Sequence, residues 1–107
     1  MAEQNGNNIS ADELAGFMRA ISHPTRVQII LEMARHNNQI SGEIVAVKNV
    51  SPATIIQHLR DLKKAGIIQG KLFGAACHYS LNEKAIEKFR QLFNAFADVV
   101  EKQSEVG

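Results

Sequence analysis

The residue pattern changes abruptly at Gly66, and this change limits the possible folds more than any other feature of the chain. From Ser51 to Gly66 the sequence SPATIIQHLRDLKKAG has apolar residues at helical spacing, a serine and a proline suited to a helix start, and a glycine suited to its end. The sequence IIQGKLFGAACHYSL that follows mixes β-branched, aromatic and small residues and is broken by Gly70 and Gly74. It predicts a two-stranded hairpin with its tip near Phe73 to Ala75.

Four other segments have helical patterns. Ser10 precedes two acidic residues and an apolar stripe, Pro24 suits a first helical turn, and Asn82 suits a helix cap. The predicted helices cover Ser10 to about Ile21, Pro24 to about His36, a short segment from Ser41 to about Asn49 that carries Ile44, Val45 and Val47, and Glu83 to about Gln103. With the helix from Ser51 and the hairpin, this order predicts a mainly α (α+β) winged helix-turn-helix with about five helices and a two-stranded β-hairpin wing.

At 107 residues, the chain is short enough to form one domain. We expect a flexible N-terminal segment at 1–9, a folded domain at 10–103 and a flexible C-terminus at 104–107. No apolar run reaches the ~18 residues needed to cross a bilayer, and the polar N-terminus lacks the pattern of a secretion signal, so a cytoplasmic protein is expected. Cys77 is the single cysteine and has no partner within the chain, which fits a reducing compartment.

The charges are distributed unevenly along the chain. The window 48–71 holds five cations and one anion, a net charge of +4, whereas the rest of the chain holds seven cations and ten anions, a net charge of −3. A basic zone on an otherwise acidic domain is typical of a phosphate-binding face. The alternative is a solvated helix face that binds nothing.

The helix predicted from Ser51 has two different faces. At about 100° per residue, Ile55, Leu59 and Leu62 fall on one side, where they would hold the helix to a core. The opposite side carries short or amide-bearing residues in its first two turns and cations mostly later. A helix that enters the DNA major groove by its N-terminal end needs this arrangement, because small residues let the backbone approach the bases. We therefore predict a recognition helix.

The residues of this helix differ in the DNA groups they suit. Gln57 can pair with an adenine edge through two hydrogen bonds, and Thr54 can bond a base or pack its methyl group on thymine. Arg60 and Lys64 suit phosphates, as do the free N–H groups at the helix start, while Lys71 is the one Lys or Arg of the hairpin. The predicted DNA-binding residues are Lys48, Ser51, Pro52, Ala53, Thr54, Gln57, His58, Arg60, Lys64 and Lys71.

Three motifs together carry a resemblance to a known family. ISHPTRVQII, SPATIIQHLRDLKKAGII and HYSLN, in this order and spacing, closely resemble the ArsR/SmtB family of bacterial winged-helix transcriptional repressors. The resemblance covers the chain from about Ser10 to Phe96. It implies a homodimer that places two recognition helices in successive major grooves of double-stranded operator DNA and represses a promoter until a signal releases it.

The resemblance also implies that the first and last helices form the dimer contact. The last helix is apolar around more than one side and holds three of the five phenylalanines, which is more than a monomer of this size needs to cover its core. The alternative is a buried helix in a monomer. The residues expected at the dimer interface are Leu14, Phe17, Met18, Ile21, Phe89, Leu92, Phe93, Phe96 and Val100.

Many members of this family bind metals, and their ligand positions are occupied by other residues here. The resemblance aligns a Cys-x-Cys pair of those members with Ile40 and Gly42, which cannot bind a metal. A second family site on the last helix uses carboxylates and histidines, and here Asp98 and Glu101 stand without a histidine. We therefore expect a metal-independent member that needs no cofactor.

The inducing signal stays open at the level of the sequence. It could be an unidentified small effector, a thiol switch through Cys77, or the abundance of the protein itself. Cys77 and His78 are neighbours on a strand and so point to opposite faces, which argues against one shared ion. A buried structural cysteine is the more common alternative.

No arrangement of residues for catalysis is found, and no enzyme is expected. The sequence has no glycine-rich phosphate loop, nucleophile elbow or metalloprotease box. The other alternative is a winged-helix module for protein–protein assembly, whose recognition surface would be apolar or acidic. Thr54, Gln57, Arg60 and Lys64 disfavour it.

Overall fold

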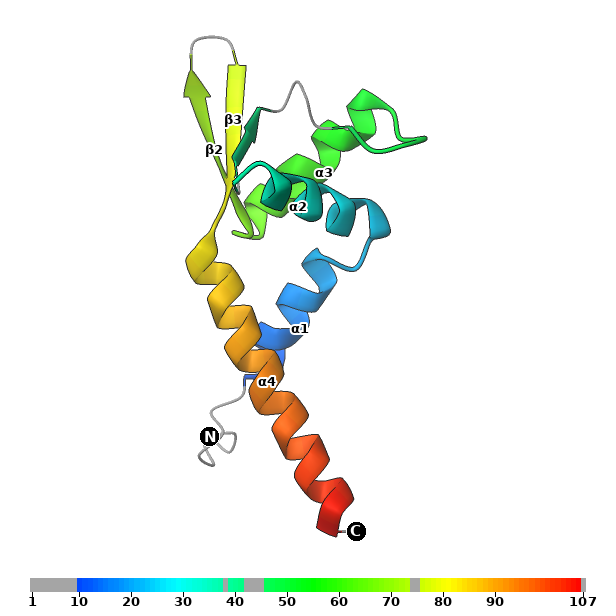
Figure 1. Ribbon diagram of the computed structural model, residues 1–107, viewed down its shortest axis with the longest axis vertical. Helices are drawn as coiled ribbons and strands as arrows, with labels where there is room; N and C mark the ends of the chain where they lie inside the picture. The colour runs from blue at the N-terminus through cyan, green and yellow to red at the C-terminus, as the bar shows by residue number, and fades with distance from the viewer. Residues whose placement is uncertain (1–9, 38, 42–45, 74–75, 107) are drawn as a thin grey trace.

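A computed structural model describes residues 10–37, 39–41, 46–73 and 76–106. Its elements are α1 (Ala11–Ala20), α2 (Pro24–Arg35), β1 (Gln39–Ser41), α3 (Pro52–Lys64), β2 (Ile68–Phe73), β3 (Ala76–Leu81) and α4 (Glu83–Val106). In Figure 1, α2, α3 and the sheet form one end of the molecule, and α4 extends away from them with α1 beside it. The molecule is elongated, 54 × 27 × 22 Å. Within the described ranges, no helix is both long and apolar enough to cross a membrane.

Capping residues set the helix starts where the sequence predicts them. The hydroxyl of Ser10 accepts a hydrogen bond from the backbone N–H of Glu13 at 3.1 Å, and that of Ser51 accepts one from the N–H of Thr54 at 3.3 Å. Each bond satisfies a backbone donor that the first turn of a helix leaves without a partner. Pro24 and Pro52 stand at first helical positions, where no N–H is needed.

A hydrogen bond from Asn82 links the start of α4 to the turn that ends α3. Gly66 has a φ of 81°, a left-handed conformation that favours glycine, and it turns the chain out of α3. The side chain of Asn82 donates to the carbonyl of Gly66 at 3.0 Å and accepts from the N–H of Ala85 at 3.3 Å. Asn82 therefore caps α4 and fixes its origin to the end of α3.

The three strands form an antiparallel sheet in the order β1-β3-β2. β2 and β3 are the predicted hairpin, with Ile68 opposite Leu81 and Phe73 opposite Ala76. The predicted tip at Gly74 and Ala75 lies outside the described residues. β1 was not predicted; it pairs with β3, with Ile40 opposite Tyr79.

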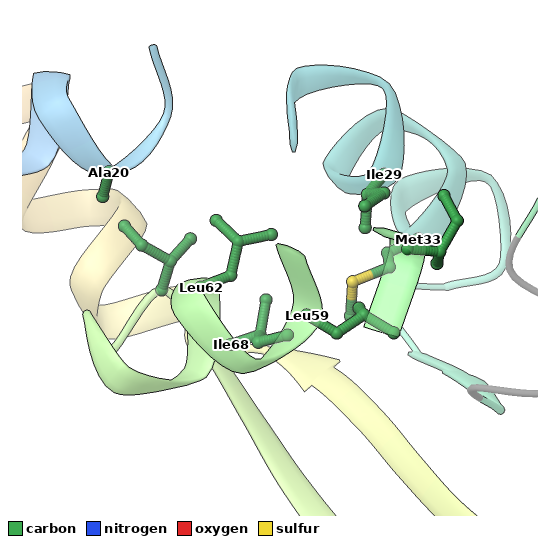
Figure 2. Close-up of a cluster of buried hydrophobic side chains, with 8 residues drawn as sticks. Ala20, Ile29, Met33, Leu59, Leu62 and Ile68 are labelled. Carbon is green, nitrogen blue, oxygen red and sulfur yellow. The ribbon is translucent and has the colours of Figure 1, made fainter. Parts of the chain in front are cut away.

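The hydrophobic core lies between α2, α3 and the start of the hairpin. Ile29 and Met33 of α2, Leu59 and Leu62 of α3, and Ile68 of β2 have no more than 1% of their surface exposed. Figure 2 shows their side chains converging, with Ala20 from the end of α1 at the edge of the cluster. This packing holds α3 by one face only.

The short helix predicted between Ser41 and Asn49 is the main difference from the sequence analysis. Ser41 belongs to β1, and residues 46–50 form an irregular segment with a turn at Lys48 and Asn49. Asn49 has a φ of 67°, a left-handed conformation that a right-handed helix cannot contain. Any helix before Asn49 would therefore end there. Residues 42–45, including the predicted Ile44 and Val45, lie outside the described part of the chain. The described residues thus contain four helices rather than about five, and the fold is a mainly helical winged helix-turn-helix.

Candidate nucleic-acid interface

α3 has a buried side and a solvent-facing side. Ile55, Leu59 and Leu62 are at most 2% exposed. The predicted contact residues lie on the other side: Ser51, Pro52, Ala53, Thr54, Gln57, Arg60 and Lys64 are all exposed. The polar side chains of the first two turns are therefore accessible to a ligand, while the helix itself is held firmly to the core.

The first turn of α3 is held by two hydrogen bonds between the same pair of residues. Ser51 accepts from the backbone N–H of Thr54, and its own hydroxyl donates to Thr54 Oγ1 at 3.0 Å. Thr54 Oγ1 thus serves as an acceptor in this pair and keeps its own O–H available as a donor. The cap orders the helix start that the proposed DNA contact uses.

Arg26 of α2 connects three parts of the fold at the edge of this surface. Its Nη1 donates to the carbonyl of Ala20 at the end of α1 at 2.9 Å, its Nε donates to Nδ1 of His58 at 3.0 Å, and its Nη2 donates to Oδ2 of Asp61 at 2.6 Å. The side chain of Arg26 is only 12% exposed. A charged group this far from water needs such partners, and here it has one for each of its three nitrogens.

Asp61 also accepts a hydrogen bond from Gln57. Gln57 Nε2 lies 3.0 Å from Asp61 Oδ1, one turn along the same helix. The two carboxylate oxygens of Asp61 are thus divided between a cation in the fold and an amide on the exposed side of α3. We call the residues Arg26, Gln57, His58 and Asp61 the Arg26 network.

His58 acts in this network as an acceptor. Because its Nδ1 accepts from Arg26, the ring is neutral in this arrangement. Burial, together with the nearby charges of Arg26 and His23, lowers the pKa of His58 below its usual value. The ring also packs against that of His23 with a centroid distance of 5.6 Å. His58 is among the residues predicted to bind DNA, and in the structure its ring packs on His23 and accepts a hydrogen bond from Arg26.

The remaining predicted cations lie at the borders of α3. Lys48, in the turn before α3, and Lys71, on β2, are both exposed. Lys71 stands opposite His78 in the hairpin. Both lysines are thus accessible to a ligand.

Cys77 lies within the hairpin and is partly buried. It stands opposite Leu72 in the register of the two strands. Burial, with a smaller contribution from contact with the Cys77 thiol, raises the pKa of Tyr79. Gly70, opposite Tyr79, leaves the space that these two side chains occupy, since a Cβ there would lie 3.3 Å from Tyr79 Cε1 and 3.4 Å from Cys77 Sγ.

A row of aromatic rings marks the other end of the molecule. Phe17 of α1 contacts Phe89 of α4 at a centroid distance of 5.6 Å, and Phe93 and Phe96 continue the row at 6.3 and 6.1 Å. Phe93 and Phe96 are each 43% exposed and Val100 is 50% exposed, whereas Leu14 and Leu92 are buried within the chain. We call the exposed residues Met18, Phe93, Phe96 and Val100 the apolar α1–α4 surface.

A cavity of about 210 Å³ adjoins this row of rings. Its lining is apolar throughout and includes Val27 and Leu31 of α2, which are among the exposed large side chains. The residues around it are Phe17, Ile21, Val27, Ile30, Leu31, Ile67, Ile86 and Phe89. Because Phe17 and Phe89 line the cavity and also belong to the ring row, the two apolar features are continuous.

The histidines and carboxylates do not gather into a metal-binding group within the part of the chain that the structure describes. His23 is the residue before α2 and makes no side-chain cap, and His36 follows the end of α2 and contacts Glu32 Oε2 at 3.2 Å through Nε2. The contact of His36 is thus local to α2, whereas the ring of His23 packs on His58 of α3.

The contacts of Arg26 and Asp61 were not predicted from the sequence. The Gln57–Asp61 contact has a local signal, because residues four apart lie side by side on a helix. The Arg26–Asp61 contact joins residues 35 positions apart and has no local signal. It depends on how α2 packs against α3.

Comparison with known proteins is consistent with this geometry. Residues 23–69 match the family described as bacterial regulatory protein, arsR family. The chain is 35% identical over 69 residues to the transcriptional repressor SdpR of Bacillus subtilis, covering 64% of this chain and 76% of SdpR. It is 26% identical over 77 residues to the HTH-type transcriptional regulator YgaV of Escherichia coli, covering 72% of this chain and 78% of YgaV.

Solved structures have the same fold. An ArsR-like transcriptional regulator from Rhodococcus sp. RHA1 superposes with a TM-score of 0.70 at 26% identity and covers 89% of this chain and 90% of its own. The transcriptional repressor BigR from Xylella fastidiosa superposes with a TM-score of 0.65 at 21% identity, covering 90% of this chain and 97% of its own. The second similarity concerns the fold alone.

Proposed function

The chain belongs to the ArsR family of DNA-binding transcription regulators, a family of non-enzymatic proteins, and from this premise we propose that it is a homodimeric, metal-independent repressor. In this proposal, Thr54 and Gln57 of α3 contact base edges, and Arg60, Lys64 and Lys48 contact phosphates. The observation that carries it is the division of α3 into a fully buried face and an exposed face of small, amide-bearing and cationic residues.

The charge and shape of α3 support this division of roles. At the exposed start of α3, the helix dipole and the backbone N–H of Ala53 favour a phosphate near Ser51 and Ala53, while the N–H of Thr54 is held by Ser51. Arg60 and Lys64 are exposed later in the helix, where the duplex backbone passes on either side of the groove. Lys71 on the wing is a further exposed cation.

The salt dependence of binding tests the phosphate contacts. We expect the affinity for duplex DNA to fall steeply between about 50 and 200 mM salt, because bound cations release counterions from the DNA. Arg60→Ala should reduce the slope of log affinity against log salt by about 1. Lys102→Ala is the matched control, because Lys102 is an exposed cation on α4 away from α3, and its slope should equal that of the unaltered protein. Salt-insensitive binding, or equal slopes in both variants, contradicts the proposal.

The homodimer in this proposal forms through the apolar α1–α4 surface. Phe93, Phe96 and Val100 expose 43 to 50% of their surface on one helix, and the apolar cavity continues the same region. A second copy that covers both would remove this apolar area from water. Leu14 and Leu92 are buried within one chain and would support the contact from beneath.

Mass measurement by light scattering tests the dimer. We expect two chains per particle for the unaltered protein and one for Phe96→Glu, because a carboxylate in an apolar interface loses its hydration without a partner. Asn94→Glu is a matched control on an exposed neighbouring position, and it should stay dimeric. A monomeric unaltered protein contradicts this part of the proposal.

Metal independence is supported by the residue types at the ligand positions of metal-binding members. Ile40 and Gly42 have no metal-binding side chain, and Asp98 and Glu101 have no histidine beside them in α4. Elemental analysis of protein purified without chelator, followed by DNA binding with and without added Zn²⁺, tests this. Stoichiometric zinc that changes DNA affinity would overturn it.

A further inference from the structure

We propose that Asp61, held in place by Arg26, is a positioning residue that fixes how the amide of Gln57 is presented to a base. This inference rests on the proposed function, in which Gln57 contacts a base edge. It assigns a specificity role to two residues that do not themselves need to touch DNA. The inference is based on two hydrogen bonds to Asp61, one from Arg26 and one from Gln57.

The contact with Asp61 decides the orientation of the Gln57 amide. An ionised carboxylate only accepts hydrogen bonds, so the amide must turn its Nε2 toward Asp61 Oδ1, 3.0 Å away. Oε1 and the second N–H of Nε2 remain for another partner. That pair, one acceptor and one donor, is what a bidentate contact with the N6 and N7 edge of adenine needs.

Asp61 is itself held by a partner that has little freedom. Its other oxygen, Oδ2, lies 2.6 Å from Arg26 Nη2, and the remaining two nitrogens of Arg26 are held by Ala20 and His58. The Arg26 side chain is 12% exposed and that of Asp61 is 36% exposed, so the charge-assisted bond between them is shielded from water mainly at its Arg26 end. The position of Asp61 is thus set by α2 and the end of α1.

The charges in this arrangement explain how an anion is accommodated on a DNA-facing helix. A carboxylate near the phosphate backbone is unfavourable by simple repulsion. Arg26 offsets the charge of Asp61 from the protein side, while Arg60 and Lys64 remain exposed on the same helix. Asp61 can therefore orient Gln57 without making the surface acidic.

The same contacts could instead serve folding alone. In that case the loss of Asp61 would lower the stability of the protein and weaken binding to all duplexes equally. A positioning role differs, because it changes the ratio between duplexes that differ at the base pair contacted by Gln57. The two roles are therefore separated by discrimination between sequences and not by affinity.

A double-mutant cycle on DNA discrimination tests the inference. The preferred duplex is first selected from a random pool, and affinities are then measured for it and for duplexes altered at one base pair at a time. The variants are Asp61→Ala, Gln57→Ala and the double variant. We expect Asp61→Ala to reduce discrimination about 3- to 10-fold at the base pair that Gln57→Ala also affects, and to leave other base pairs unchanged.

The double variant shows whether Asp61 acts through Gln57. In the Gln57→Ala background, Asp61→Ala should cause no further loss of discrimination at that base pair, because no amide is left to orient. Asp98→Ala is the matched control: it removes one exposed anion from α4, so it changes the net charge equally and should keep full discrimination. This control separates orientation from a general gain in positive charge.

A conservative variant keeps the test valid if Asp61→Ala unfolds. Asp61→Asn keeps the size of the side chain but has one acceptor oxygen in place of two. The Arg26 guanidinium should take that oxygen, which leaves the new NH₂ group facing Gln57 and turns its amide around, so discrimination should fall as in Asp61→Ala. In the free protein, the side-chain NH₂ resonances of Gln57 should shift strongly in both variants, and unchanged resonances would contradict the inference.

The outcomes distinguish this inference from the proposed function. If the unaltered protein discriminates between duplexes but Asp61→Ala discriminates equally well, the inference is wrong and the proposed function stands. The inference is also wrong if Asp61→Ala causes the same loss in the presence and absence of Gln57. If the unaltered protein shows no preference among duplexes, the base-reading role of Gln57 fails, and the inference fails with it.

Discussion

Replacing Leu59 by Ala should destabilise the protein far more than replacing Ile56 by Ala. Both residues lie in α3, one turn apart. Leu59 has no exposed surface and packs among Ile29, Met33 and Leu62, whereas Ile56 is 45% exposed. The pair therefore tests whether α3 is held to the fold by a single face.

The expected free energies follow from the burial of the two side chains. Each substitution removes three carbon groups, and at about 0.8 kcal/mol per buried CH₂ the full loss for Leu59 is about 2.4 kcal/mol. The space left in the core raises this to about 3 to 5 kcal/mol. Ile56 already has nearly half of its surface in water and leaves no enclosed space, so its loss should be about 1 kcal/mol.

Urea unfolding followed by circular dichroism measures both values. All samples are compared at one protomer concentration, because the stability of a dimer depends on concentration. Equal losses for the two variants, or a larger loss for Ile56→Ala, would refute the reasoning, since it would mean that the buried face of α3 is not the one described.

Three further predictions concern local contacts. The pKa of His58 in the fold lies below its usual value of 6.5, so the unfolded chain binds a proton at this ring before the folded chain does. The stability that is fully present above about pH 6.5 should therefore be lost as the pH falls through the folded-state pKa. Urea midpoints measured against pH should show this loss, and His58→Gln should remove it. Ser51→Ala should lower the free energy of unfolding by about 1 kcal/mol through loss of the α3 cap, and an unchanged urea midpoint would contradict this. Gly70→Val should lower the melting temperature, because the new side chain would crowd Tyr79 and Cys77. An unchanged melting temperature would contradict this, because it would mean that these two side chains move aside without loss of stability.

The sequence predicts the starts of α1, α3 and α4 because their signals are local. Ser10, Ser51 and Asn82 each cap a helix by bonding to a residue three positions further on. The apolar stripe of α3 predicts its buried face, since Ile55, Leu59 and Leu62 are the residues that the structure buries. Such features need no knowledge of the rest of the fold.

The features that the sequence does not predict depend on distant residues. β1 is three residues long and exists as a strand because it pairs with β3, where Ile40 meets Tyr79. The Arg26 network likewise depends on the packing of α2 on α3, which brings Arg26 and Asp61 together. Neither residue pair has a spacing that a local pattern could reveal.

Selection of preferred duplexes from a random pool, with the unaltered protein and with Gln57→Ala at one salt concentration, tests the central claim most directly. We predict that the unaltered protein selects two related half-sites about one helical turn apart. We predict further that Gln57→Ala loses preference at one position in each half-site, at a cost of about 1 to 3 kcal/mol for the preferred duplex. An unchanged set of selected sequences would contradict the claim that the exposed face of α3 reads DNA through Gln57.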